Sequence, residues 1–115
     1  MFDFEKFEVY KKAKEFVKQV NDFLETIPKK ENRILDQLSR ASLSIPLNIA
    51  EGAGRFTKND KKNFYIIARG SLNESIAVLQ SLLDLKLFSE PDYKHFYELY
   101  TKISKMLSGL INSQK

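Results

Sequence analysis

The sequence predicts an all-α protein, an antiparallel up-down four-helix bundle, and three observations lead to this fold class. Apolar residues recur at spacings of three and four along four long stretches, which is the period of an amphipathic helix. No stretch keeps the alternation of a strand, and proline or glycine punctuates the helical stretches. Helices of roughly 20 to 28 residues joined by short loops are typical of up-down bundles. We therefore expect one domain over residues 1–115, because 43% hydrophobic residues can fill a core.

The first two helices are bounded by helix-breaking residues. Apolar positions at helical spacing run over residues 4–27, and Pro28 stops the first helix there. A second periodic run covers residues 34–49, and we expect Gly52 and Gly54 to end it in a loop.

The last two helices carry capping signals at their starts. Thr57 and Asn59 are candidate caps for a third helix, whose apolar run covers residues 64–85 and is the longest. A serine, a proline and an acid at residues 89–92 open a fourth helix, with apolar positions over residues 96–110.

Composition and charge limit the classes of function. Lys and Arg number 19 against 15 Asp and Glu, so the net charge is +4 and the pI is near 9.2, which permits binding to polyanions without requiring it. The absence of cysteine excludes disulfides, cysteine-ligated zinc and thiol nucleophiles. We expect a cytoplasmic protein with no membrane partner, because the first residues lack the order of a signal peptide and no apolar run approaches the ~20 residues of a membrane span.

The segment around Pro46 departs from the regular helical pattern. A proline inside a helix removes a backbone donor, at a cost of ~3 kcal/mol. Ser44, Asn48 and Glu51 have the spacing i, i+4 and i+7, so a helix aligns them in one stripe, with Arg40 one turn earlier. Polar residues aligned in this way indicate a site or an interface.

A second departure is Gly70, which lies inside the third helix and costs ~1 kcal/mol there relative to alanine. We expect Gly70 and Ser71 to admit a close approach of the second helix at Ala41 and Ser44. Glu74 would then meet Arg40 or Asn48. The predicted polar cluster between the two helices consists of Arg40, Ser44, Asn48, Glu51, Ser71 and Glu74.

Two motifs in these segments carry a family resemblance. The stretch 37–55 contains the core Ser-x-Pro-x-Asn-Ile-Ala-Glu-Gly at Ser44 to Gly52, and the stretch 64–74 contains Ala-Arg-Gly-Ser-Leu-x-Glu. Over nearly its whole length the chain resembles the four-helix bundle family named after the 23S rRNA intervening-sequence protein. The resemblance implies assembly into a homopentamer, and most members have no established biochemical activity. The family is also similar to the accessory protein of diversity-generating retroelements, a basic pentameric bundle that binds a reverse transcriptase and nucleic acid.

Each unusual group of residues has a structural and a functional interpretation. For the polar cluster we favour a structural network that fixes helix packing or joins subunits, over a ligand or nucleic-acid site. The basic residues near the second loop form an ordinary solvated surface in a monomer, but a continuous positive rim when repeated around a ring. These nucleic-acid-binding candidates are Arg55, Lys58, Lys61 and Lys62. Lys29 and Lys30 occupy the loop expected at the other end of the bundle.

Several apolar and aromatic residues exceed what one core needs. We expect some of the third helix to meet another subunit, because it has leucines pointing in several directions: Leu79, Leu82, Leu83 and Leu85. Phe56 and Tyr65, near the basic loop, either stack on bases or anchor the end of the bundle. The lysines and glutamates that alternate between residues 8 and 18 predict a solvated face.

Enzymatic interpretations find little support in the residues. His95 is the single histidine and has no cysteine partner, so a nucleophilic triad depends on one unsupported residue. A two-metal bundle site needs inward acids on all four helices, whereas only Glu51 and Glu74 are credible here. The glycines of the second loop lack the following Lys-Thr of a phosphate loop. We therefore expect no catalytic residue, metal or cofactor.

The sequence thus favours a non-enzymatic, homo-oligomeric bundle that acts as a scaffold for RNA, DNA or a nucleic-acid enzyme through its basic rim. The alternative is a protein–protein adaptor with no role in nucleic-acid binding.

Overall fold

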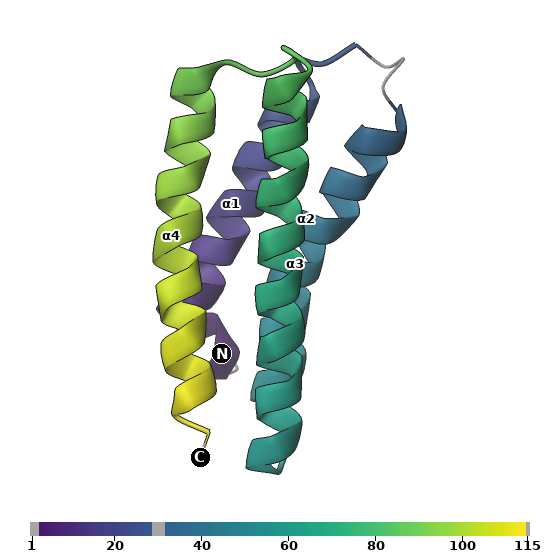
Figure 1. Ribbon diagram of the computed structural model, residues 1–115. Coiled ribbons are helices and arrows are strands. Elements are labelled where there is room, and N and C mark those ends of the chain that lie inside the picture. Colours follow the sequence, from purple (N-terminus) through teal and green to yellow (C-terminus); the bar gives the residue numbers. More distant parts are fainter. Residues whose placement is uncertain (1–2, 29–31, 115) are drawn as a thin grey trace.

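The computed structural model describes residues 3–28 and 32–114, and within these ranges it contains helices and no strand. A short 3₁₀ helix, η1 (Asp3–Lys6), precedes four α-helices. These are α1 (Glu8–Leu24), α2 (Asn32–Ala53), α3 (Lys58–Asp84) and α4 (Glu90–Asn112). They lie side by side in a bundle of 43 × 23 × 22 Å (Figure 1).

Contacts between neighbouring helices show that α2 and α3 run antiparallel to each other, and so do α3 and α4. Ser44 of α2 contacts Ser71 of α3, and Gly52, two turns further along α2, contacts Tyr65, nearly two turns earlier on α3. The same reversal relates α3 to α4, where Asn73 bonds to Tyr100 and Gln80 bonds to Tyr93. The predicted fold class, an all-α four-helix bundle, is confirmed.

The core consists of the inward faces of the four helices, and α3 buries more of its circumference than one stripe. Phe16 of α1 packs edge-to-face on Phe96 of α4, with ring centroids 5.7 Å apart. Phe88, from the loop before α4, contacts both Phe23 and Phe96 and closes one end of the core. The largest fully buried apolar side chains in the remaining core are Leu38, Ile45, Ile49, Leu72, Leu79, Leu82, Ile103 and Leu107.

The first helix is shorter than the predicted range 4–27. It begins at Glu8, because Phe7 has an extended backbone and η1 lets the ring of Phe4 pack against Tyr10 at 5.0 Å. It ends at Leu24, and buried Ile27 follows in the loop. The N–H groups of Thr26 and Ile27 donate to the carbonyls of Phe23 and Leu24, so the chain leaves the helix in a tighter turn, and Pro28 disfavours helical backbone at Ile27.

The second helix is longer than predicted, because it continues through Pro46 and through Gly52 to Ala53. Gly52 is therefore a helix residue. Of the two candidate caps for α3, Thr57 is the N-cap and accepts a bond from the Asp60 N–H at 3.1 Å, whereas Asn59 lies inside the helix. Ser89 caps α4 as predicted.

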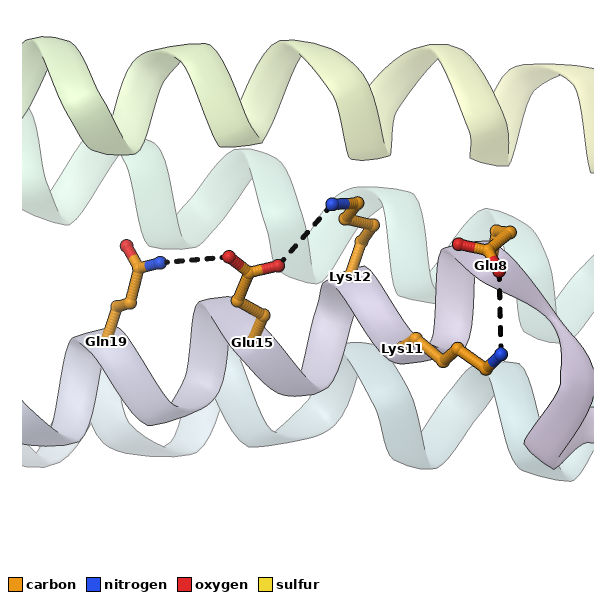
Figure 2. Close-up of polar contacts among 5 residues, drawn as sticks. All are labelled: Glu8, Lys11, Lys12, Glu15 and Gln19. Atoms are coloured by element: carbon orange, nitrogen blue, oxygen red, sulfur yellow. Dashed lines mark hydrogen bonds and ion pairs between the residues drawn. The ribbon is translucent and has the colours of Figure 1, made fainter.

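The outer face of α1 is polar and solvated, as the alternating charges predict. Lys11 pairs with Glu8 at 3.5 Å, and Lys12 pairs with Glu15 at 3.6 Å. Figure 2 shows these pairs in a row along α1, continued by a bond of 3.4 Å from Gln19 to Glu15. Exposed pairs of this kind contribute little to stability. None of the helices in the described part of the chain has the length and apolar character needed to cross a membrane.

Candidate functional site

Three members of the predicted polar cluster meet in the groove between α2 and α3. The Asn48 side-chain amide donates to the hydroxyl and to the carbonyl of Ser44, each at 2.8 Å. The Ser71 hydroxyl donates to the Ser44 hydroxyl at 2.8 Å and so joins the two helices. All three side chains are half-buried. Hydrogen bonds of this kind fix the register between packed helices.

The other three members do not join this network. Glu51 points along its own helix and forms an ion pair with Arg55 at 3.0 Å. Arg40 and Glu74 are exposed, and neither has a hydrogen bond or ion pair with any described residue. The expected contact of Glu74 with Arg40 or Asn48 is therefore not made. Glu51 and Glu74 are also not inward acids, because both are exposed.

The close approach of α2 and α3 occurs at Gly52. A Cβ atom built on Gly52 would lie 2.6 Å from Cε1 of Tyr65 and 3.1 Å from Cβ of Phe64. Gly70, for which we predicted this role, is exposed and has nothing within 4 Å of its Cβ position. A sequence shows that a glycine is unfavourable in a helix but not which glycine has a neighbour.

The basic residues around the α2–α3 loop are partly engaged within the chain. The Arg55 guanidinium, besides its ion pair, lies over the Phe64 ring at 4.6 Å. Lys61 donates to the Ala53 carbonyl at 2.8 Å and so satisfies the end of α2. Lys58 is exposed and Lys62 is half-buried. The counterpart lysines Lys29 and Lys30 lie outside the described residues.

The two aromatic residues near this loop have different environments. Phe56 is fully exposed and lies at the rim of an open hollow, whereas Tyr65 is 1% exposed and belongs to the core. Tyr65 therefore anchors the bundle end, and only Phe56 is free to contact a partner. The hollow has a volume of about 820 Å³, and its lining residues are Leu47, Ala50, Glu51, Gly54, Arg55, Phe56 and Asp60.

Burial raises the pKa of the Tyr65 phenol, because the low-dielectric surroundings disfavour the phenolate. The folded state thus holds this proton more tightly than the unfolded chain. This stability is fully present below the usual pKa of about 10 and is lost as the pH rises through the raised value. In a pH titration of the native protein, we expect one part of the phenolate absorbance to appear only at a higher pH than the rest. Unfolding in urea should remove this difference. Persistence of the difference in a Tyr65→Phe variant would contradict the assignment.

Branched apolar side chains lie exposed on the outer faces of α2 and α3. Leu43 and Leu47 of α2 are 49% and 56% exposed, and Ile66 and Ile67 of α3 are 39% and 50% exposed. The sequence predicted an apolar surplus on the third helix but assigned it to the wrong residues. Leu79 and Leu82 are buried and Leu83 is partly buried, so of the four leucines only Leu85 is exposed.

Potential metal ligands are scattered in the described part of the chain. No three His, Asp or Glu side chains there are grouped in a way that could hold a metal ion. His95 is exposed and contacts the Phe96 ring.

The fold and these surfaces define the class of the protein: a four-helix bundle whose candidate site is the outer face and loop end of an antiparallel helix pair. Comparison with family models matches residues 5–109 to the 23S rRNA-intervening sequence protein family. The chain belongs to this family, as the two sequence motifs predicted.

A solved structure from Bacteroides thetaiotaomicron has the same fold, with a TM-score of 0.81 and 24% sequence identity. It is described as a protein of unknown function from the S23 ribosomal protein family. The match covers 90% of this chain and 97% of that chain. A search of curated proteins finds no match.

Proposed function

We propose that the protein is a non-enzymatic scaffold that assembles from several copies through the outer faces of α2 and α3, and that its basic loop ends contact nucleic acid or a nucleic-acid enzyme. One observation carries the proposal: branched apolar side chains on these faces are about half exposed, namely Leu43, Leu47, Ile66 and Ile67. Several large apolar side chains exposed on two neighbouring helices are more than scattered surface residues, and exposed apolar patches mark interaction sites in proteins. The family resemblance favours a homopentamer.

Assembly gives the basic loop its importance. The loop region holds four cations, while Glu51 and Asp60 supply two carboxylates, so one copy presents only a modest positive charge. Several copies with their loops at one end would form a positive rim. Phosphates bind such a surface with release of counterions.

The test of assembly is sedimentation of the purified protein over a range of concentrations. We expect a particle several times heavier than the 13.4 kDa chain. A 13.4 kDa particle at every concentration would reject the scaffold in this form.

Replacing the loop cations should weaken binding to structured RNA. A variant with Arg55→Gln, Lys58→Gln, Lys61→Gln and Lys62→Gln keeps polar side chains but carries four fewer positive charges per copy. We expect the log–log slope of affinity against salt to fall by about one unit for each phosphate that the variant no longer neutralises. A filter-binding salt titration measures this slope.

The matched control removes four cations from the solvated face of α1, by Lys11→Gln, Lys12→Gln, Lys14→Gln and Lys18→Gln. We expect this variant to bind more tightly than the loop variant. Equal weakening in both variants would show that only net charge matters and would remove the role of the rim.

A protein–protein adaptor is the second candidate, supported by a surface at the opposite end of α3. Leu85 is 55% exposed and Tyr97 is 47% exposed. Tyr97 lines a hollow of about 380 Å³ together with Leu83, Glu90, Tyr93 and Lys94. Nuclease treatment of the complex purified from cells separates the two candidates. A bound polypeptide that survives the nuclease but no longer binds the Leu85→Ser and Tyr97→Ser variant favours the adaptor.

A further inference from the structure

Among the charges of α2 and α3 that pair with no described residue are two of opposite sign that stand close in level on the outer faces, Arg40 and Glu74. Arg40 and Glu74 have no ion pair or hydrogen bond in the described part of the chain, unlike Glu51, whose charge Arg55 already balances. Arg40 lies one turn before Ser44, and Glu74 lies one turn after the Ser71 that Ser44 contacts. The two charges therefore stand at the same level of the bundle, on neighbouring helices, and both point into solvent.

Each of the two charges lies at one end of a short strip of exposed residues, and the strip on α2 complements the strip on α3. The α2 strip consists of Arg40, Leu43 and Leu47, and the α3 strip consists of Glu74, Gly70 and Ile67. Helical spacing places each set on one face of its helix. Both strips span eight residues, which are seven steps of 1.5 Å or about 10 Å. Each has a charge at one end and an apolar residue at the other.

The middle positions complement each other in size. Leu43 is 49% exposed. Gly70 is exposed and has no atom within 4 Å of its Cβ position. A large side chain on one helix opposite a glycine on another allows the two backbones to approach closely, as Gly52 already does within the chain.

We propose that the α2 strip of one copy packs antiparallel on the α3 strip of a second copy, so that Arg40 forms an ion pair with Glu74 of the second copy. This inference rests on the self-assembly proposed above and adds the residue that the partner supplies. Leu43 then covers Gly70 of the second copy, and Leu47 contacts Ile67 of the second copy.

The charges select the antiparallel orientation. If the two strips were parallel, each charged end would lie against the apolar end of the other strip. Both charges would lose water without gaining a partner, which is costly. Unpaired or like charges at an interface therefore disfavour the wrong orientation of two partners.

This orientation determines how the copies are related. Within a chain α2 and α3 are antiparallel, so contact of α2 with an antiparallel α3 from the next copy makes the two α2 helices parallel. The copies then point the same way, as in a closed ring whose axis follows the helices. The α2–α3 loops of all copies lie at one end of that ring, which is the arrangement that the basic rim requires.

Charge reversal tests the contact, with sedimentation equilibrium as the measurement. Arg40→Glu alone and Glu74→Arg alone each place like charges at every contact, and we expect each to weaken association at least tenfold. In a mixture of the two variants, every contact between unlike copies pairs opposite charges again. We expect the double variant, which pairs opposite charges at every contact, to regain association. We expect the mixture to associate more tightly than either variant alone, although a ring with an odd number of copies keeps one like-charge contact.

Matched controls are Lys11→Glu and Glu15→Arg on α1, which change the net charge equally and should leave association unaltered. Circular dichroism of each variant checks that it folds. If the wild-type protein assembles but the single reversals assemble equally well, or the double variant stays dissociated, the Arg40–Glu74 contact is overturned while the scaffold stands. A monomeric wild-type protein would instead reject the scaffold itself.

Discussion

Gly52→Ala should destabilise the protein, although alanine is the better helix former. The added methyl would lie 2.6 Å from Cε1 and 2.9 Å from Cδ1 of Tyr65, closer than carbon atoms can pack. The Tyr65 ring is 1% exposed and cannot turn into solvent. Overpacking of this kind costs about 1–3 kcal/mol, whereas helix preference returns only about 1 kcal/mol. We expect a net loss of about 1 kcal/mol in the free energy of unfolding, measured by urea titration at one fixed protein concentration.

Gly109→Ala is the matched control for this substitution. Gly109 lies inside α4, is exposed and has nothing within 4 Å of its Cβ position. The same chemical change should therefore raise stability by up to about 1 kcal/mol. If both alanine variants were stabilised alike, the close contact between α2 and Tyr65 would not exist in solution.

The architecture was predictable from the sequence because it depends on local signals. The helical period of the apolar residues gave the fold class, and the chemistry of Thr57 and Ser89 located two helix starts. Where the prediction missed, a tertiary contact decided the outcome. The packing of Phe4 on Tyr10 separates η1 from α1, which no propensity of that segment indicates.

The candidate site was predictable only in part. The helical stripe correctly placed Ser44 and Asn48 on one face, and Ser71 meets them across the groove. Whether Glu74 reaches Arg40 or Asn48 depends on the distance between the axes of α2 and α3. The spacing of residues along the sequence does not give that distance. The leucines of α3 were misassigned because this helix packs against both α2 and α4, so more of its circumference is buried within the chain than one core stripe suggests.

Gly70→Gln should separate folding from assembly. Within one chain the new side chain meets nothing, because the Cβ position of Gly70 has no neighbour within 4 Å. Glutamine is a much better helix former than glycine, so we expect the folded protomer to gain about 0.5–1 kcal/mol. In the assembled protein the same side chain would occupy the space that Leu43 of another copy fills. An overpacking cost of about 1–3 kcal/mol per contact corresponds to roughly 5- to 150-fold weaker association.

The comparison variant is Gly109→Gln, which makes the same change on exposed α4. We expect it to stabilise folding to a similar degree and to leave association intact, since α4 is not part of either strip. Urea titration measures the first quantity and sedimentation equilibrium the second. An interface at the α3 strip requires that Gly70→Gln stabilises folding but weakens association. Gly109→Gln should stabilise folding and leave association unchanged. If Gly70→Gln assembled as tightly as the wild-type protein, the α3 strip would be free of any close subunit contact, and assembly would have to use another face of the bundle.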